Sequence, residues 1–480
     1  MGVKMNRLTL LSDNDIAAIH KTSLRILSEI GVQIPVPPVL DRLEQAGAKV
    51  DRASETARLP ENLVMDSLQK AGKKYILYGR DNSQSVRFGY GDFILPSTEG
   101  QVMIVEDDGR VRRPATGTDV RNAIRISDAL EHIDWLGGIV LPDDVPPAIR
   151  DVWLTAELLK GSTKPQHVFF DNAASFRYAV KVCEAAAGSR EENRRHPRLA
   201  AFIEPISPLR FARNGLEVLV ACVQEELPVY FGPMVQTGST GPVTMAGTAA
   251  LENAEVLSAV VIAQVFNPGI PVGYGCSCHT VDLKSMMISF GAAEQSLFGV
   301  AMTQMAHYYG LPSLFNAGLA DSKRHDAQSG IERGITMICG ALAGLETFGP
   351  MGIVGADQGA SLEQLIIDNE MGGYVKRILK GFEVNEENLA WEVIQRVGIG
   401  GNFMTDDHTL AHFRDELWSS PGFDRRNWDT WSAAGAKSMY DWALDRKQQI
   451  LDEHEPEPID PKLSTELDEI VAAAQRELAG

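Results

Sequence analysis

A cluster of ionisable residues directly follows a short apolar segment in the second half of the chain. In "SLFNAGLADSKRHDAQSGIERG", residues 313–334, these side chains are Asp321, Lys323, Arg324, His325 and Asp326. Carboxylate, ammonium and imidazole groups held together can bind a charged substrate or move a proton. A charged loop can also be no more than a solvated surface, so the elements that position the cluster decide its meaning.

Eight short apolar runs, each followed by a helical pattern, set the rhythm of the central part of the chain. They begin at Phe93, Asp134, Gln166, Leu199, Pro228, Ile270, Pro312 and Thr347, roughly 30 to 42 residues apart. This tempo predicts an α/β fold, a (β/α)8 TIM barrel over residues 91–360. A doubly wound open sheet would alternate similarly, but the count of eight and the lack of a GxGxxG motif after the first run favour the barrel.

The flanking regions have different patterns. Residues 1–90 predict an N-terminal helical appendage, whose first helix Ser12 can cap together with Asp15. Residues 361–480 predict a C-terminal helical extension. Within the central region, Asp108-Gly109 marks the turn of a hairpin inserted after the first apolar run.

Composition restricts the possible partners and compartments. The chain has 45 basic and 64 acidic residues, a net charge of −19, which disfavours nucleic acid. Five cysteines are an odd number in a 480-residue chain, so a reducing compartment is expected. We find neither a signal peptide nor an uninterrupted apolar run of about 18 residues, and therefore expect a cytoplasmic protein that does not enter a membrane.

In a barrel of this kind, the active site lies where the strands end. That rule selects Ser97, Glu99, Asp143, Asp144, Asp171, Asn172, Glu204, Ser207, Met234, Gln236, Thr237, Tyr274, Cys276, Cys278, His279, Asn316, Asp321, Lys323, Asp357 and Gln358. Glu204 follows two apolar residues and precedes a proline, which places it near the barrel mouth. The alternative for Glu204 is an ion pair with Arg210.

Aromatic residues on the predicted strands suggest the kind of ligand. They are Phe170, Phe202, Phe231, Tyr274, Phe315 and Phe348. Core packing is the default interpretation for any one of them, because strand alternation sends some side chains inward and others into the core. Several aromatics together with carboxylates at the mouth would suit a quaternary or tertiary ammonium ion.

A zinc site is the alternative in the segment "YGCSCHTVD". Cys276, Cys278 and His279 are zinc-ligand types, but the C-x-C-H spacing is poor for one tetrahedral ion. A substrate-facing loop is the preferred interpretation, and we expect no metal.

Four long motifs carry a resemblance to a known family. "FIEPISPLR", "GYGCSCHTVDLKS", "FNAGLADSKRHDAQSGIERG" and "SLEQLIIDNEM" together resemble the trimethylamine methyltransferase family, over nearly the whole chain. The resemblance implies a (β/α)8 barrel enzyme that moves a methyl group from a methylated amine to the Co(I) corrinoid of a separate protein. Archaeal trimethylamine enzymes carry pyrrolysine at a position that we align with Lys323. Ordinary lysine here is similar to the branch that demethylates quaternary amines, with glycine betaine as the first substrate expected.

Position at the strand ends, combined with the chemistry that the resemblance implies, suggests roles for individual residues. The catalytic candidates are Glu204, Asp321 and Lys323, and the substrate-binding candidates are Phe231, Tyr274, Phe315, Asn316, His325, Phe348, Asp357 and Gln358. Glu204 and Asp321, with the aromatics, would hold the cation. Asn316, Lys323 or His325 would meet a substrate carboxylate.

The expected partners are therefore a small methylated amine and a corrinoid protein. The chain has no DxHxxG cobalamin motif of its own, so the corrinoid would arrive on the partner. We also expect a homo-oligomer. Two alternatives stay open: a zinc-dependent methyltransferase that acts on a thiol acceptor through Cys276, Cys278 and His279, and a non-catalytic betaine-binding protein.

Overall fold

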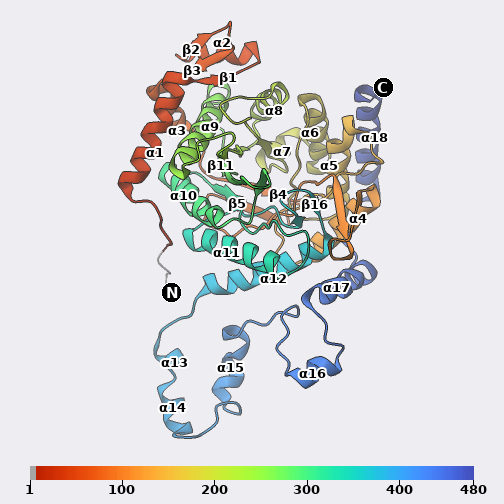
Figure 1. Cartoon of the computed structure of the whole chain (residues 1–480). Coiled ribbons are helices and arrows are strands. Elements are labelled where there is room, and N and C mark those ends of the chain that lie inside the picture. Colours follow the sequence, from red (N-terminus) through yellow and green to blue (C-terminus); the bar gives the residue numbers. More distant parts are fainter. Residues whose placement is uncertain (1–6, 480) are drawn as a thin grey trace.

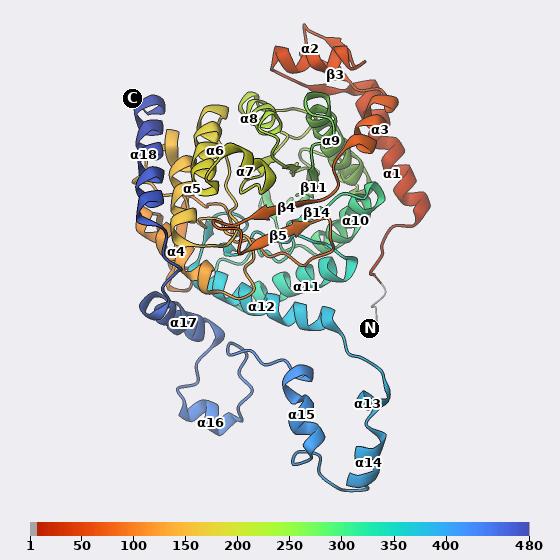
Figure 2. The same cartoon turned by 180° about the vertical axis from the view of Figure 1, so that it is seen from behind.

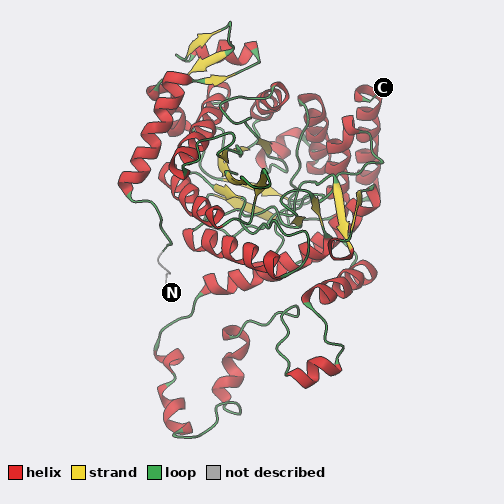
Figure 3. Ribbon diagram, viewed as in Figure 1, coloured by secondary structure: helices red, strands yellow, loops and turns green. Residues whose placement is uncertain are grey.

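Four short parallel strands form the centre of the fold. The structure, a computed structural model, describes residues 7–479. The strands lie in the order β8 (Ala201–Ile203), β9 (Val229–Phe231), β11 (Val272–Cys276) and β14 (Ser313–Phe315). Helices surround them (Figure 3). Because both faces are covered, these strands are apolar runs rather than alternating patterns, as expected for a buried parallel sheet. The predicted α/β class is confirmed.

Single parallel bridges extend this order to the remaining apolar runs. Leu314 pairs with Thr347, Ile94 with Thr347, Pro96 with Trp135, and Leu136 with Gln166. The pairings therefore run in chain order from the fourth run to the eighth, and from the eighth on to the first, second and third. Between the third run and β8, no such pairing occurs within residues 7–479. Closure into an eight-stranded barrel stays a prediction.

Helices follow the parallel segments and cover their outer side (Figure 1). They are α4 (Gly117–Ala129), α5 (Arg150–Gly161), α6 (Ala173–Ala187), α7 (Arg190–Arg195), α8 (Arg213–Gln224), α9 (Met245–Phe266), α10 (Ala293–Tyr309), α11 (Ala327–Ala343) and α12 (Leu362–Lys380). Helix α9 is long and apolar enough to cross a membrane by length and composition. However, 89% of its apolar window is buried inside the protein, which is typical of a core helix.

A hairpin from the N-terminal region closes one end of the parallel segments. It consists of β4 (Tyr75–Tyr78) and β5 (Ser85–Phe88), which lie across the centre of the fold in Figure 2. Its side chains pack on Ile94, Trp135 and Ala200, near the points where the parallel segments begin. The opposite end, where the strands end, is left for a site.

The other small sheets lie at the periphery or at that open end. At the N-terminus, β1 (Val32–Gln33), β2 (Lys49–Asp51) and β3 (Thr56–Arg58) accompany α1 (Asp13–Arg25), the π-helical turn Ile26–Ile30, α2 (Pro37–Gln45) and α3 (Glu61–Lys70). The predicted cap of α1 by Ser12 and Asp15 is present. The N-terminal region thus contains strands as well as the predicted helices.

The predicted hairpin around Asp108-Gly109 is confirmed as β6 (Met103–Glu106) and β7 (Val111–Pro114). Its sheet continues into β16 (Gly359–Ala360) and β15 (Ile353–Val354). A further sheet consists of β10 (Gln236–Thr237), β12 (His279–Asp282) and β13 (Met287–Ser289), which follow β9 and β11 in the chain.

The C-terminal region is helical, as predicted. Helix α18 (Pro461–Leu478) packs on α5 and α6, and α17 (Met439–Glu453) packs on α12 and α4. Between α12 and α17, the segment with α13 (Glu386–Leu389), α14 (Trp391–Val397), α15 (Asp407–Glu416) and α16 (Trp428–Ala433) projects away from the body (Figures 1 and 2). The domain boundaries at residues 90 and 360 stay predictions.

The hairpin that closes the fold generates a stability prediction. The Phe88 ring stacks on Tyr75 at 4.5 Å between centroids and meets Trp135 edge-on at 5.1 Å. We expect Phe88→Ala to lower the free energy of unfolding by about 3–5 kcal/mol, because it leaves a cavity in the core. Urea denaturation measures this change. Tyr90→Ala, at a more exposed ring of the same segment, is the control, and an equal loss in both variants would contradict the role of the hairpin.

Candidate functional site

A cavity of about 260 Å³ lies where the parallel segments end. Its lining is Pro96, Thr98, Glu99, Gly100, Gln101, Val102, His167, Phe169, Phe202, Glu204, Tyr230, Met234, Ser277, Phe290, Leu314, Asn316, Phe348, Gly349, Pro350, Ile353 and Asp357. Nearly every parallel segment contributes to it. The expectation that strand ends build the site therefore fits this cavity.

Three carboxylates, those of Glu99, Glu204 and Asp357, line the cavity. Glu204 accepts no hydrogen bond and forms no ion pair within the described residues, and the alternative partner Arg210 does not contact it. The Glu204 side chain is exposed to solvent, although protein atoms also surround it densely. Desolvation, together with the charges of Glu99 and Asp357, raises the pKa of Glu204 to about 7.

Asp357 is held in an unusual backbone conformation. Gly355, Ala356 and Asp357 all have positive φ, at 68°, 51° and 67°. Such strain in non-glycine residues is often found at functional sites. The Asp357 carboxylate accepts a hydrogen bond from Gln101 at 2.7 Å, while desolvation and the charge of Glu99 raise its pKa to about 6. Glu204 and Asp357 therefore form an acidic wall, and neither carboxylate is ion-paired within residues 7–479.

Glu99 differs because a histidine is its partner. His167 Nε2 lies 2.5 Å from Glu99 Oε1, and the same nitrogen contacts the Tyr230 hydroxyl. The imidazole stacks on Trp135 with 4.0 Å between ring centroids. Glu99, His167 and Tyr230 are all buried, so this cluster forms a rigid floor. Glu99 satisfied the strand-end rule, whereas nothing in the local sequence distinguished His167 or Tyr230.

Aromatic rings form much of the remaining wall. Phe169 meets Phe202 edge-on at 5.0 Å, and Phe202 stacks on Tyr230 at 4.8 Å. Phe290 and Phe348 complete the set. Neither lysine nor arginine occurs among the cavity-lining residues of the described chain. An aromatic, acidic cavity whose lining contains neither lysine nor arginine favours a small cation.

Four predicted site residues line this cavity: Glu204, Asn316, Phe348 and Asp357. Three predicted aromatics, Phe231, Tyr274 and Phe315, belong instead to the packed layer between strands and helices. The Tyr274 hydroxyl donates to Asn253 of α9 at 2.6 Å, and Phe315 lies against Gly299 of α10. Alternation explains the difference, because Tyr230 and Leu314, one position before Phe231 and Phe315, line the cavity instead. In β8 the predicted aromatic Phe202 does line the cavity.

Asp321 lies behind the cavity wall. Its carboxylate accepts from the backbone N–H of Phe290 at 2.6 Å and from Gly291 at 3.2 Å, and it contacts the Ser289 hydroxyl. Asp321 therefore positions Phe290, which lines the cavity. The exposed side chain of Lys323 lies beside Gly355, two residues before Asp357, at the rim.

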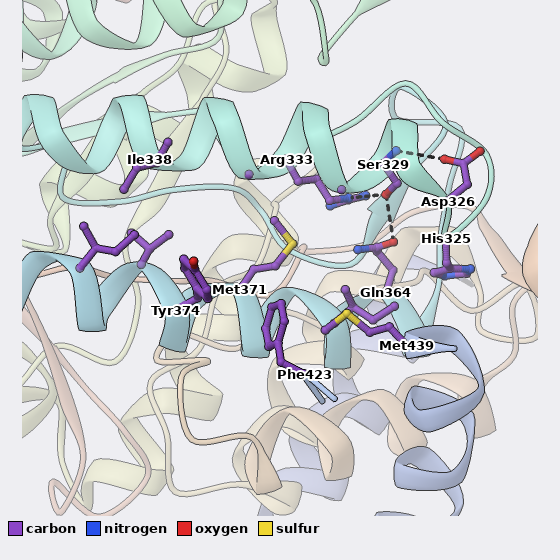
Figure 4. A pocket seen from close by; sticks show the side chains of 15 residues that line it. His325, Asp326, Ser329, Arg333, Ile338, Gln364, Met371, Tyr374, Phe423 and Met439 are labelled. Carbon is purple, nitrogen blue, oxygen red and sulfur yellow. Dashed lines mark hydrogen bonds between the residues drawn. The ribbon is translucent and has the colours of Figure 1, made fainter. Parts of the chain in front are cut away.

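His325 and Gln358 lie outside the cavity. His325 Nδ1 is 3.2 Å from Asp108, its Nε2 is 3.2 Å from the Ser361 hydroxyl, and its ring stacks on Tyr440. It borders a different pocket, between α11 and α12 (Figure 4). The Gln358 carbonyl accepts a hydrogen bond from Arg112 at 2.9 Å. The ionisable cluster of residues 321–326 is thus divided among several places.

The zinc alternative finds no geometric support. Cys276, Cys278 and His279 are buried, and burial lowers the pKa of His279 to about 3. Across residues 7–479, no group of three or more His, Cys, Asp or Glu side chains is arranged to hold a metal ion. The site therefore rests on carboxylates and aromatic rings.

Comparison with known proteins gives a consistent family. Residues 2–479 match the family described as "Trimethylamine methyltransferase (MTTB)". Trimethylamine methyltransferase MttB of Desulfitobacterium hafniense strain DCB-2 is 33% identical, over 97% of this chain and 94% of the relative. Glycine betaine methyltransferase of D. hafniense strain Y51 is 31% identical, over 100% and 99%.

A solved structure also resembles the chain. The Methanosarcina barkeri monomethylamine methyltransferase (MtmB) matches with a TM-score of 0.47 and 12% identity, over 93% of this chain and 96% of that one. The sequence relatives cover the chain almost from end to end and are all named methyltransferases. The chain belongs to the trimethylamine methyltransferase family.

Proposed function

We propose that this protein transfers a methyl group from a quaternary or tertiary methylated amine to the Co(I) corrinoid of a separate protein. The observation that carries the proposal is Glu204, a carboxylate without a partner in a cavity walled by aromatic rings. A methylated ammonium ion would neutralise Glu204 and lie against the rings by cation–π attraction.

The size of the cavity supports delivery of the corrinoid by a partner. A volume of about 260 Å³ is below the range of roughly 300–1,000 Å³ that holds drug-sized ligands. A small amine fits such a space, but a corrinoid ring does not. A corrinoid docked at the mouth would supply the nucleophile that takes the methyl group. As the new bond to the methyl carbon formed, the carbon–nitrogen bond would break, and the nitrogen of an ammonium substrate would keep the electron pair and leave as a neutral amine.

The residues of the chain then act by position and charge. Glu204 and Asp357 attract the cation, and Phe202, Tyr230 and Phe348 hold it and exclude water. A quaternary ammonium needs no general base, because it leaves as a neutral amine. The rate therefore depends on alignment and electrostatics.

We further propose that the eight parallel segments close into a (β/α)8 barrel around this site. The chain-ordered pairings from residue 94 to residue 347 support closure. At the remaining junction, the edge-on contact of Phe169 with Phe202 bridges the two segments.

The residues that line the cavity also suggest which methylated amines react faster. Glycine betaine is the first substrate expected from the sequence, and one relative is named for it. Its carboxylate would face Glu204 and Asp357, with only Lys323 at the rim to meet it. We therefore propose that methylated amines with an uncharged tail react faster than glycine betaine.

Methyl transfer tests the proposal. The protein is incubated anaerobically with reduced cobalamin and a panel of tetramethylammonium, choline, trimethylamine and glycine betaine, and the absorbance change from Co(I) to methyl-Co(III) is followed. We expect Glu204→Gln to lower kcat/KM on the order of 100-fold, because it removes the charge that faces the cation. Glu191→Gln, at an exposed glutamate of α7, is the control. Binding without transfer to any acceptor would instead favour the non-catalytic binder.

Lys323 tests the order of substrates. We expect Lys323→Met to lower kcat/KM for glycine betaine roughly tenfold, because it removes a basic group at the rim that could meet the carboxylate. The value for tetramethylammonium should stay unchanged or rise. Equal losses for both substrates would show that Lys323 does not discriminate by the tail.

The pKa values predict the pH dependence of binding. With pKa values of about 7 and about 6, Glu204 and Asp357 become protonated and neutral as the pH falls. The affinity for tetramethylammonium, measured by calorimetry, should therefore be roughly tenfold weaker at pH 5.5 than at pH 8. Glu204→Gln should remove most of this dependence. An affinity that is constant, or that strengthens as the pH falls, would contradict the assignment.

A further inference from the structure

A segment of the C-terminal region, residues 382–416, projects from the body of the protein and contacts it only near its ends. We call this segment, which contains α13, α14 and α15, the arm. It stands away from the body in both views (Figures 1 and 2), and none of its residues is buried. Short helices are marginally stable in water and depend mostly on packing of an apolar face, which α13, α14 and α15 lack within one chain.

The arm has many exposed apolar side chains. They are Phe382, Val384, Leu389, Trp391, Ile394, Ile399, Phe403, Met404, Leu410 and Phe413. Trp391 and Ile394 lie one helical turn apart on α14, and the Trp391 side chain is 68% exposed. So many exposed apolar side chains within one segment are typical of an interaction site.

The arm is nevertheless held in a fixed shape. Arg396 binds Asp406 at 2.7 Å, which joins the end of α14 to the start of α15. At the other end, Arg377 and Lys380 of α12 donate to the carbonyls of Glu416 and Asp415 at 2.6 and 2.9 Å. Both ends of the arm are thus tethered to α12, so docking would cost less conformational entropy than docking of a free tail.

The body of the same chain carries an apolar groove of about 430 Å³ (Figure 4). It lies between α11 and α12, and its apolar half is lined by Ile338, Ile367, Met371, Tyr374, Val375, Ile378, Phe423 and Met439. Ile331 and Ile335 of α11 add to the exposed apolar surface of this helix. The groove continues along α12 toward the root of the arm.

We propose that the arm of one copy docks on the groove between α11 and α12 of a second copy, and the reverse. The arm and the groove both have exposed apolar surface and belong to the same chain. In a two-fold dimer, each arm would cover the groove of the other copy, so one isologous interface would bury both surfaces. A different protein would have to cover the two surfaces separately. The arm has eight acidic and two basic residues, which disfavours nucleic acid or an anionic membrane as the occupant.

Sedimentation velocity of the full-length protein over a range of concentrations tests the proposal. We expect a dimer or a larger oligomer built from dimers. Trp391→Glu in the arm and Ile335→Glu in α11 should each weaken association on the order of 100-fold. Ile30→Glu, at an exposed isoleucine of the N-terminal region, is the matched control and should not change it. Circular dichroism checks that all variants fold.

Mixing the variants tests the pairing itself. A heterodimer of the Trp391→Glu and Ile335→Glu chains keeps one intact arm on one intact groove, so the mixture should recover part of the association that each variant lacks alone. A monomeric wild-type protein, or a mixture that stays monomeric at every concentration, would overturn the proposal. So would association of either variant equal to that of the wild type.

Discussion

The site depends on one constraint: it is energetically unfavourable to hold two carboxylates close together in a cavity lined largely by protein atoms. Glu204 and Asp357 face the same small space, and neither is ion-paired within residues 7–479. Both keep contact with solvent, but partial desolvation and the neighbouring negative charges raise the pKa of both carboxyls. A carboxylate in this situation either takes up a proton or attracts a positive ligand. The aromatic walls favour a ligand that offers charge without needing hydrogen-bond partners. A methylated ammonium ion has these properties.

The two ends of the parallel segments have different roles in the fold: one end is closed by packing, and the other forms the site. At the end where the segments begin, the hairpin of β4 and β5 fills the interior with Tyr75, Leu77 and Phe88. At the other end, short loops bring Glu99, Glu204 and Asp357 together from segments far apart in the sequence. The floor between the two is the cluster of Trp135, His167 and Tyr230, which is too densely packed to move easily.

Much of this organisation could be predicted from the sequence. The spacing of the apolar runs indicated the order of the parallel segments, and the strand-end rule selected Glu204, Asp357 and Asn316. The rule worked because it depends only on where a run stops. The sequence could not show which residues of a strand face the cavity and which face the helices. Phe231 and Phe315 are as apolar as the neighbours that face the cavity. A parallel strand covered on both faces carries no polar residue that would mark its orientation.

The charged stretch at residues 321–326 shows a second limit. Charges adjacent in sequence do not stay together, because a loop turns successive side chains in different directions. Asp321 supports the backbone of Phe290, Arg324 and His325 bind Asp108, and Asp326 caps α11. The resemblance to the family singled out Lys323, which alone among these side chains lies at the rim beside the loop of Asp357.

The position of a bound cation tests the central claim most directly. A crystal structure of the protein with a tetramethylarsonium ion would locate the arsenic by anomalous scattering. We predict that the arsenic lies in the cavity beside the Glu204 carboxylate, within about 6 Å of the centroids of the Phe202 or Tyr230 rings. An ion bound elsewhere on the protein, with the cavity empty, would contradict the account.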